Sequence, residues 1–263
     1  MPNELRGLSV NDFAHPEDLA AVNSLMKIQA IDKLMSSIEE KSNEIYIRMI
    51  TLGNCVRITE QNDPKLFRIV KKVCEILDYE HTPEIYTYRS FGIDVEPSGV
   101  DKPVLIIPDF VVNNFDDNML YFAIGRAVTR LKSGYLKFFI AAKIMLLATD
   151  SIPFVSDAMK LALSNWLRKS ELTADRGGML ACQNFQTAIR FLMCKAGMPL
   201  KETKTVKVHD YIEDCKFDGS LAKVGKTVQT LSNSTGWAND RISELFLWNA
   251  QGNYGDILDK YLD

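Results

Sequence analysis

The sequence predicts an α+β protein that is mostly helical and carries a small β-sheet or hairpin. Apolar residues recur at helical spacing over most of the chain, two short β-type runs lie close together before its midpoint, and helix-start signals precede the longest apolar stripes. At 263 residues, 46% hydrophobic and 25% charged, the chain is long enough to bury a sizeable core. No repeat, low-complexity tract or linker divides it, so we expect a single domain over residues 1–263. Within it we expect N-terminal helices over 1–80, the sheet and two site-bearing helices over 81–183, and C-terminal helices over 184–263.

Capping residues and apolar stripes set the expected helices. They predict a helix from Pro16 whose stripe continues through Ile31, Leu34, Met35 and Ile38, one from Asp63–Pro64 to about Asp78, one from Asp116–Asp117 to Lys132, and one from Asp157 through Ala181. The most apolar run, 138–148, is about eleven residues long and contains Lys143. A membrane span needs roughly twenty apolar residues, so this run is interpreted as a core helix.

Strand-type residues occur at 85–88 and 104–107. Pro97, Ser98 and Gly99 lie between these runs and favour a turn. We therefore expect a hairpin here, as the only strand region of the chain.

Composition excludes several classes of function. The net charge is −3, and no Lys/Arg stripe interleaved with aromatics is present, so a nucleic-acid partner is not expected. The N-terminus lacks the pattern of a signal peptide, and the five cysteines form no paired framework. These features predict a protein of the reducing cytoplasm that does not span a membrane.

Local motifs give no metal site. His15, His81 and His209 are widely separated, and no Cys-x-x-Cys pair accompanies them. Each histidine is interpreted as a surface or packing residue. The chain also lacks a phosphate loop, a dinucleotide fingerprint and a Gly-x-Ser-x-Gly elbow.

Two segments about forty residues apart nevertheless resemble a known active site. Residues 124–134 read Ile-Gly-Arg-Ala-Val-Thr-Arg-Leu-Lys-Ser-Gly, and residues 171–176 read Glu-Leu-Thr-Ala-Asp-Arg. The second segment is similar to the Glu-x-x-Ala-Asp-Arg stretch of gluzincin zinc metallopeptidases of the HtpX heat-shock protease and CAAX prenyl endopeptidase type. In that family the Glu is the third zinc ligand. The first segment falls where those enzymes carry Gly-His-Glu-x-x-His-x-x-Ser-Gly.

Matched position by position, Arg126 takes the place of the first His, Ala127 that of the Glu base, and Arg130 that of the second His. Further matching segments follow in the family's order: 15–18, 74–78, 83–86, 180–183 and 241–245. Relatives often have His-Pro before the last of these, where this chain has Gly236-Trp237. The chain thus resembles a soluble, bacterial-type member with a degenerate His-Glu-x-x-His motif, which implies a gluzincin-like fold.

The substitutions change the chemistry that the resemblance implies. A guanidinium stays protonated and offers only donors, so Arg126 and Arg130 cannot replace imidazole ligands of zinc. Ala127 cannot accept a proton from an attacking water. We therefore predict that zinc is absent, that no metal-ligating residue remains, and that no residue is catalytic by the family mechanism.

Helical geometry places both arginines on the side of Met119 and Ala123, with Gly125, Thr129 and Lys132 on the opposite, more polar arc. The resemblance brings Glu171 and Asp175 against this helix. Because a buried cation must be paired, we predict Arg–carboxylate pairs centred on Glu171 in the volume where relatives hold zinc. Two alternatives stay open, in which the arginines lie in solvent or bind a ligand anion such as a peptide C-terminus or phosphate.

The resemblance further implies a cleft in which a peptide lies extended beside the edge strand. We interpret the chain as a catalytically inactive metallopeptidase homologue, a pseudopeptidase that binds a peptide or protein partner in the former active-site cleft. The residues of that site are Arg126, Ala127, Arg130, Glu171 and Asp175. One alternative is a hydrolase or other enzyme with repurposed, zinc-independent chemistry that uses Glu171, Asp175 or a tyrosine. Another is a purely structural or assembly role, and the oligomeric state is left open.

Overall fold

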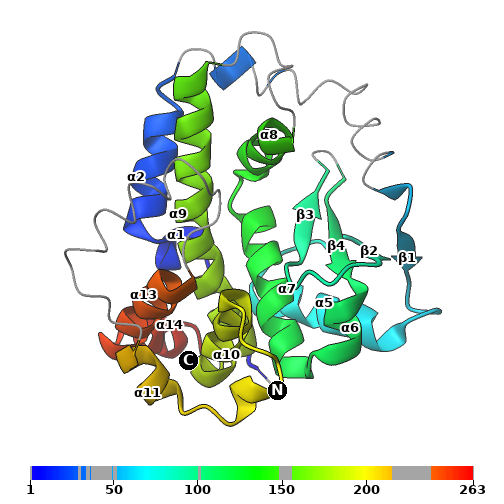
Figure 1. Cartoon of the computed structure of the whole chain (residues 1–263). Coiled ribbons are helices and arrows are strands. Elements are labelled where there is room, and N and C mark those ends of the chain that lie inside the picture. Colours follow the sequence, from blue (N-terminus) through cyan, green and yellow to red (C-terminus); the bar gives the residue numbers. More distant parts are fainter. Residues whose placement is uncertain are drawn as a thin grey trace.

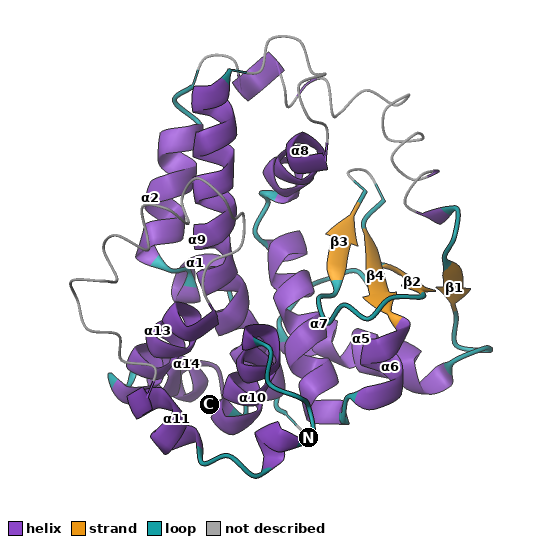
Figure 2. Cartoon of the chain, viewed as in Figure 1, coloured by secondary structure: helices purple, strands orange, loops and turns teal. Residues whose placement is uncertain are grey.

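The computed structural model describes residues 2–28, 52–99, 102–147, 156–214 and 238–262, together with 31–33, 36 and 49. Its helices are α1 (Val10–Phe13), α2 (Pro16–Leu25), α5 (Pro64–Ile76), α6 (Asp109–Asn114), α7 (Asp117–Lys132), α8 (Leu136–Leu147), α9 (Asp157–Cys182), α10 (Phe185–Ala196), α11 (Val208–Asp214), α13 (Ala238–Ala250) and α14 (Asn253–Leu262), with a 3-10 turn at Glu202–Lys204. Its strands are β1 (Val56–Ile58), β2 (Glu84–Tyr88), β3 (Glu96–Ser98) and β4 (Val104–Pro108). The mostly helical α+β class is confirmed (Figure 1, Figure 2).

The helix starts expected from capping residues are confirmed. Asp63 caps α5 by accepting from the Leu66 amide, and Asp116 caps α7 by accepting from the Met119 amide, each at 3.0 Å. α2 begins at Pro16 and α9 at Asp157, where the signals place them. An accepting carboxylate satisfies an amide that the first helical turn leaves without a partner, so the start of a helix is encoded locally.

Some expected features lie outside the described residues. These are the continuation of the first stripe through Leu34, Met35 and Ile38, the last residue of the run 138–148, and the Gly236-Trp237 position. The described part of that apolar run belongs to α8 and buries Phe139, Ile140, Ala141 and Ala142, as a core helix should. No helix within the described ranges has the length and apolar character needed to cross a membrane.

The expected hairpin between 85–88 and 104–107 is wrong. The four strands are ordered β1-β2-β4-β3, and β2 runs parallel to β4. The antiparallel partner of β4 is β3, so Pro97 and Ser98 lie in a strand and not in the turn. Proline is tolerated there because β3 is an edge strand. β1 adds a strand that the sequence analysis missed, paired antiparallel with β2.

Helices α7 and α9 form the centre of the molecule, and α7 lies between α9 and the sheet (Figure 2). α7 is buried on all sides, which corrects the expectation of a polar arc at Gly125 and Thr129. That arc packs against the two glycines of α9 instead. A Cβ on Gly177 would lie 1.8 Å from Thr129 Oγ1, and one on Gly178 would lie 2.9 Å from the Phe122 carbonyl oxygen. Glycine is therefore required for this close approach.

A methyl group at Gly177 tests the contact between α7 and α9. We expect Gly177→Ala to lower the free energy of unfolding by about 1–3 kcal/mol, because overpacking a filled interface forces neighbours apart. Combining it with Thr129→Ala removes Oγ1 and Cγ2 of Thr129, two of the three atoms that clash, so the double variant should lose less than the sum of the two single changes. Gly255→Ala in α14 is the matched control, since no atom lies near its added Cβ. Equal losses in the Gly177 and Gly255 variants, measured by urea unfolding, would contradict this packing.

Candidate functional site

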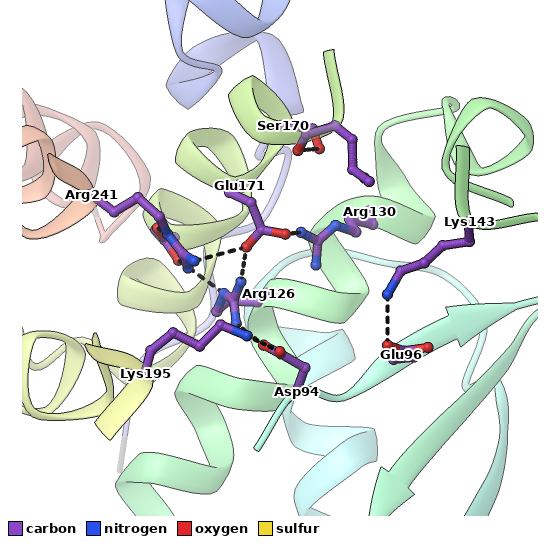
Figure 3. Close-up of polar contacts among 11 residues, drawn as sticks. Asp94, Glu96, Arg126, Arg130, Lys143, Ser170, Glu171, Lys195 and Arg241 are labelled. Carbon is purple, nitrogen blue, oxygen red and sulfur yellow. Dashed lines mark hydrogen bonds and ion pairs between the residues drawn. The ribbon is translucent and has the colours of Figure 1, made fainter. Parts of the chain in front are cut away.

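Four of the predicted site residues converge at the crossing of α7 and α9. Arg126, Arg130 and Glu171 are labelled in Figure 3. Arg126 and Arg130 are one helical turn apart on α7, and Glu171 and Asp175 are one turn apart on α9, so each pair shares a helix face. Arg126 is 2% exposed, Arg130 8%, Glu171 7% and Asp175 1%. The cluster is therefore a buried group of charges that must satisfy one another.

Glu171 is the centre of the cluster. Its Oε2 accepts from Nη2 of Arg126, and its Oε1 accepts from Nη2 of Arg130 at 2.5 Å. A third guanidinium, that of Arg241 on α13, brings Nη1 to 3.2 Å from Oε2. Both carboxylate oxygens are thus occupied by cationic donors.

Asp175 joins the same network one turn further along α9. It accepts a bidentate pair from Arg241, with both N–H···O distances 2.7 Å. Nε of Arg126 lies 2.9 Å from Oδ1 of Asp175. Forked pairing of this kind fixes the orientation of both planar groups.

Two further charged residues close the cluster on the side of the sheet. Asp94, just before β3, accepts from Nη1 of Arg126 at 2.8 Å and also pairs with Lys195 of α10. The Asp94 side chain is 36% exposed, so this carboxylate is the outermost of the three. Four cations thus contact three carboxylates, and a fourth carboxyl, that of Asp18, lies close enough to Arg130 to interact with its charge.

Aromatic rings and small residues complete the surroundings. The guanidinium of Arg126 lies over the ring of Phe191, 5.2 Å from its centroid, and that of Arg130 lies over Phe139 at 4.9 Å. Such contacts favour cations that are shielded from water. Ala127 is fully buried and contributes no polar atom to the site.

The charges shift one another's pKa values. Burial alone would raise the pKa of Glu171, but the positive charges of Arg130, Arg241 and Arg126 outweigh it and hold that pKa far below its usual range. Arg126 and Lys195 do the same for Asp94 against a similar burial effect. The guanidinium pKa of Arg126 is raised by Glu171, Asp175 and Asp94 despite complete burial. All of these groups are ionised near neutral pH.

Little open space remains beside the network. A pocket of about 20 Å³ lies next to Arg130, between Asp18 of α2, Trp166 of α9 and Tyr135 before α8. This volume holds about one water molecule. Among the described residues, the space beside Arg130 is thus too small for a peptide main chain.

The sequence analysis missed three members of the cluster: Asp94, Lys195 and Arg241. Arg241 belongs to the segment 241–245 that carried part of the family resemblance, but nothing in the local pattern of α13 marks it as buried. Asp94 and Lys195 come from a loop and from the last turn of α10, and neither position has a local signal of its partner. The histidines behave as expected of packing or surface residues: Nδ1 of His15 accepts from the Glu17 amide at the start of α2, and His81 and His209 are exposed.

Comparisons with known proteins point to the metallopeptidases. No family model and no solved structure matches the chain. The chain is similar to the plastoglobule-localized metallopeptidase 48 of the Arabidopsis thaliana chloroplast, with 22% identity over 270 residues that cover 98% of this chain and 78% of that protein. This similarity, over nearly the whole chain, supports a metallopeptidase-like protein.

The residues at the cluster do not fit the zinc ion that a metallopeptidase requires. Zinc needs neutral imidazole, thiolate or carboxylate ligands that converge on one point. Here three guanidinium groups direct N–H donors at Glu171, and a cation placed among them would meet like charge. Within the described ranges, no group of three or more His, Cys, Asp or Glu residues is arranged to hold a metal.

Removing the charge of Glu171 should strongly destabilise the fold. We expect Glu171→Gln to cost about 3–5 kcal/mol, because it leaves buried guanidinium groups without their counter-ion. Glu96→Gln is the matched control: Glu96 pairs with Lys143 at 2.8 Å, but both side chains are about two-fifths exposed. Exposed pairs contribute only about 0–1 kcal/mol. Chemical unfolding measures the free energy of unfolding of both variants. A decrease below about 1 kcal/mol for Glu171→Gln would show that the buried charge network does not stabilise the fold.

The depressed pKa values predict a specific pH dependence of stability. An unfolded carboxyl binds a proton near its ordinary pKa, 4.5 for Glu171 and 3.8 for Asp94, whereas the folded groups stay ionised at lower pH. Their contribution is therefore complete above those values and is lost as pH falls below them toward the folded pKa values. We expect the free energy of unfolding to fall below about pH 5, more steeply in the wild type than in Glu171→Gln. Parallel curves for the two proteins would contradict this assignment.

Proposed function

We propose that this chain is a metallopeptidase homologue that no longer hydrolyses peptides and instead binds a peptide or protein partner in the former active-site cleft. The former site comprises Arg126, Ala127, Arg130, Glu171 and Asp175. A cytoplasmic location is part of the same proposal.

The engagement of both Glu171 oxygens by Arg126 and Arg130 carries the proposal. The resemblance aligns these arginines with the two zinc-binding histidines and Glu171 with the third ligand. The same three positions are still in mutual contact here, but they hold one another in place of a metal. Ala127 supplies no base at the fourth position.

The same geometry argues against a repurposed enzyme that uses Glu171 as acid or base. A general acid or base works best with a pKa near the working pH, whereas the arginines lower the pKa of Glu171 far below that range. Asp175 is also bound bidentately by Arg241. Neither carboxylate has an oxygen free to face a substrate.

Partner binding is supported by the sheet edge beside the cluster. β3 is an edge strand, and it lies against α7 and α8 (Figure 1). An extended peptide can add to such an edge through main-chain hydrogen bonds, and this use of the cleft does not require catalysis.

Restoring the family motif tests the loss of catalysis. We expect the wild type, dialysed against zinc, to hold no stoichiometric metal by mass spectrometry and to cleave no peptide in a mixed library. The variant Arg126→His/Ala127→Glu/Arg130→His regains two imidazoles and should bind about one zinc ion with Glu171. Its matched control, Arg126→His/Ala127→Glu/Arg130→Gln, lacks one ligand and should bind far less. Stoichiometric zinc with cleavage in the wild type would contradict the proposal.

The same library tests partner binding. Passed over the immobilised wild-type protein, it should yield retained peptides that slow hydrogen exchange in β3 and α8. Absence of any retained peptide would favour a purely structural role over the proposed one.

A further inference from the structure

Three cations from three different helices lie near β3, an edge strand of the described sheet. Arg126 lies on α7, Lys143 on α8 and Lys195 on α10, and each pairs with an acidic residue just before or at the start of β3 (Figure 3). Asp94 binds Arg126 and Lys195, and Glu96 binds Lys143. We call Asp94 and Glu96, with these three cations, the acidic clasp.

The clasp joins β3 and the segment just before it to α7, α8 and α10. Asp94 and Glu96 are two residues apart, the spacing at which side chains of an extended chain point to the same side. Both turn from the strand toward the helices, as their partners on α7, α8 and α10 show. Their carboxylates therefore lie on the cations in the way that two acidic side chains of an incoming strand would.

The two sides of the clasp differ in how firmly they are held. Arg126 is 2% exposed and is fixed by Glu171, Asp175 and the Phe191 ring. Lys143 lies 5.5 Å from the Phe139 ring centroid, a contact that does not depend on Glu96. The side chains of Asp94 and Glu96 are 36% and 42% exposed. The Glu96–Lys143 pair is exposed and contributes little to stability, so Glu96 can leave at small cost. Asp94 is held by two less exposed cations, so it leaves only when an incoming carboxylate replaces it on Arg126 and Lys195.

Charge favours an acidic ligand. Asp94 is the outermost carboxylate of the network around Glu171, and its release leaves Arg126 and Lys195 without that partner. Pro97 also lacks an N–H, so β3 offers fewer main-chain donors than an ordinary edge strand. Side-chain charge must then supply more of the recognition.

We propose that the partner is an acidic peptide in extended conformation, with carboxylates two residues apart, and that Asp94 and Glu96 are internal occupants which it displaces. This rests on the proposed function and names the chemistry of the ligand. The bound peptide adds beside β3, and its two carboxylates take over Lys143 and the Arg126–Lys195 pair.

Isothermal titration of blocked five-residue peptides tests the clasp. The acidic probe is an alanine peptide with aspartate at its second position and glutamate at its fourth. The neutral probe has asparagine and glutamine at these two positions. We expect Asp94→Asn/Glu96→Gln to bind the acidic probe about tenfold more tightly than the wild type, because internal competition is gone. The double variant should bind the neutral probe no more tightly than the wild type does. Adding Lys143→Ala to the double variant should reduce its increased affinity for the acidic probe.

The control variant Glu60→Gln/Asp259→Asn removes the same charge from exposed positions on other elements and should leave affinity unchanged. Glu96→Gln alone, at an exposed pair that the fold does not need, should show a smaller gain and covers the case in which the double variant fails to fold. An acidic probe bound no more tightly by either clasp variant than by the wild type would overturn the inference. That result would not affect the proposed function, which is tested separately by zinc content, peptide cleavage and library binding.

Discussion

The carboxylate of Glu171, held between the guanidinium groups of Arg126 and Arg130, is the interaction on which the centre of this molecule depends. Charges at this depth are costly unless each has a counter-ion, so α7 and α9 must cross at the position that brings these groups together. The glycines of α9 permit that crossing, because they let α7 approach closely enough for side chains to meet. Arg241 and Asp94 then extend the pairing to α13 and to the loop before β3.

The same interaction determines what the site can do. A volume filled with guanidinium donors repels a metal ion, and a carboxylate bound on both oxygens does not exchange protons near neutral pH. We therefore propose that the similarity to a metallopeptidase does not extend to zinc chemistry. In the proposed function, the edge of β3 and the cations near it serve binding.

Sequence alone predicted the helices that begin at Pro16, Pro64, Asp117 and Asp157, because a capping side chain or an N-terminal proline acts within a few residues. It also predicted the contact of Arg126 and Arg130 with Glu171, which required the family resemblance to place two distant helices together. The predicted antiparallel pairing of 85–88 with 104–107 was wrong, because strand pairing is decided by tertiary packing and not by the run of β-type residues itself.

The other errors of the sequence-based prediction also concern residues whose role depends on long-range contacts. Gly125 and Thr129 looked polar on a helical wheel, yet small residues are what a tight helix crossing needs. Lys195 and Arg241 are ordinary helix residues until the fold supplies Asp94 and Asp175. The identification of the cluster as a former active site stays a prediction of the sequence, supported by this geometry.

A crystal structure of the wild-type protein grown with excess zinc, with anomalous data collected at the zinc edge, tests the central claim most directly. Arg126 and Arg130 are predicted to contact Glu171 with no anomalous peak among them. A peak bound by Glu171, with both guanidinium groups turned away into solvent, would contradict the account.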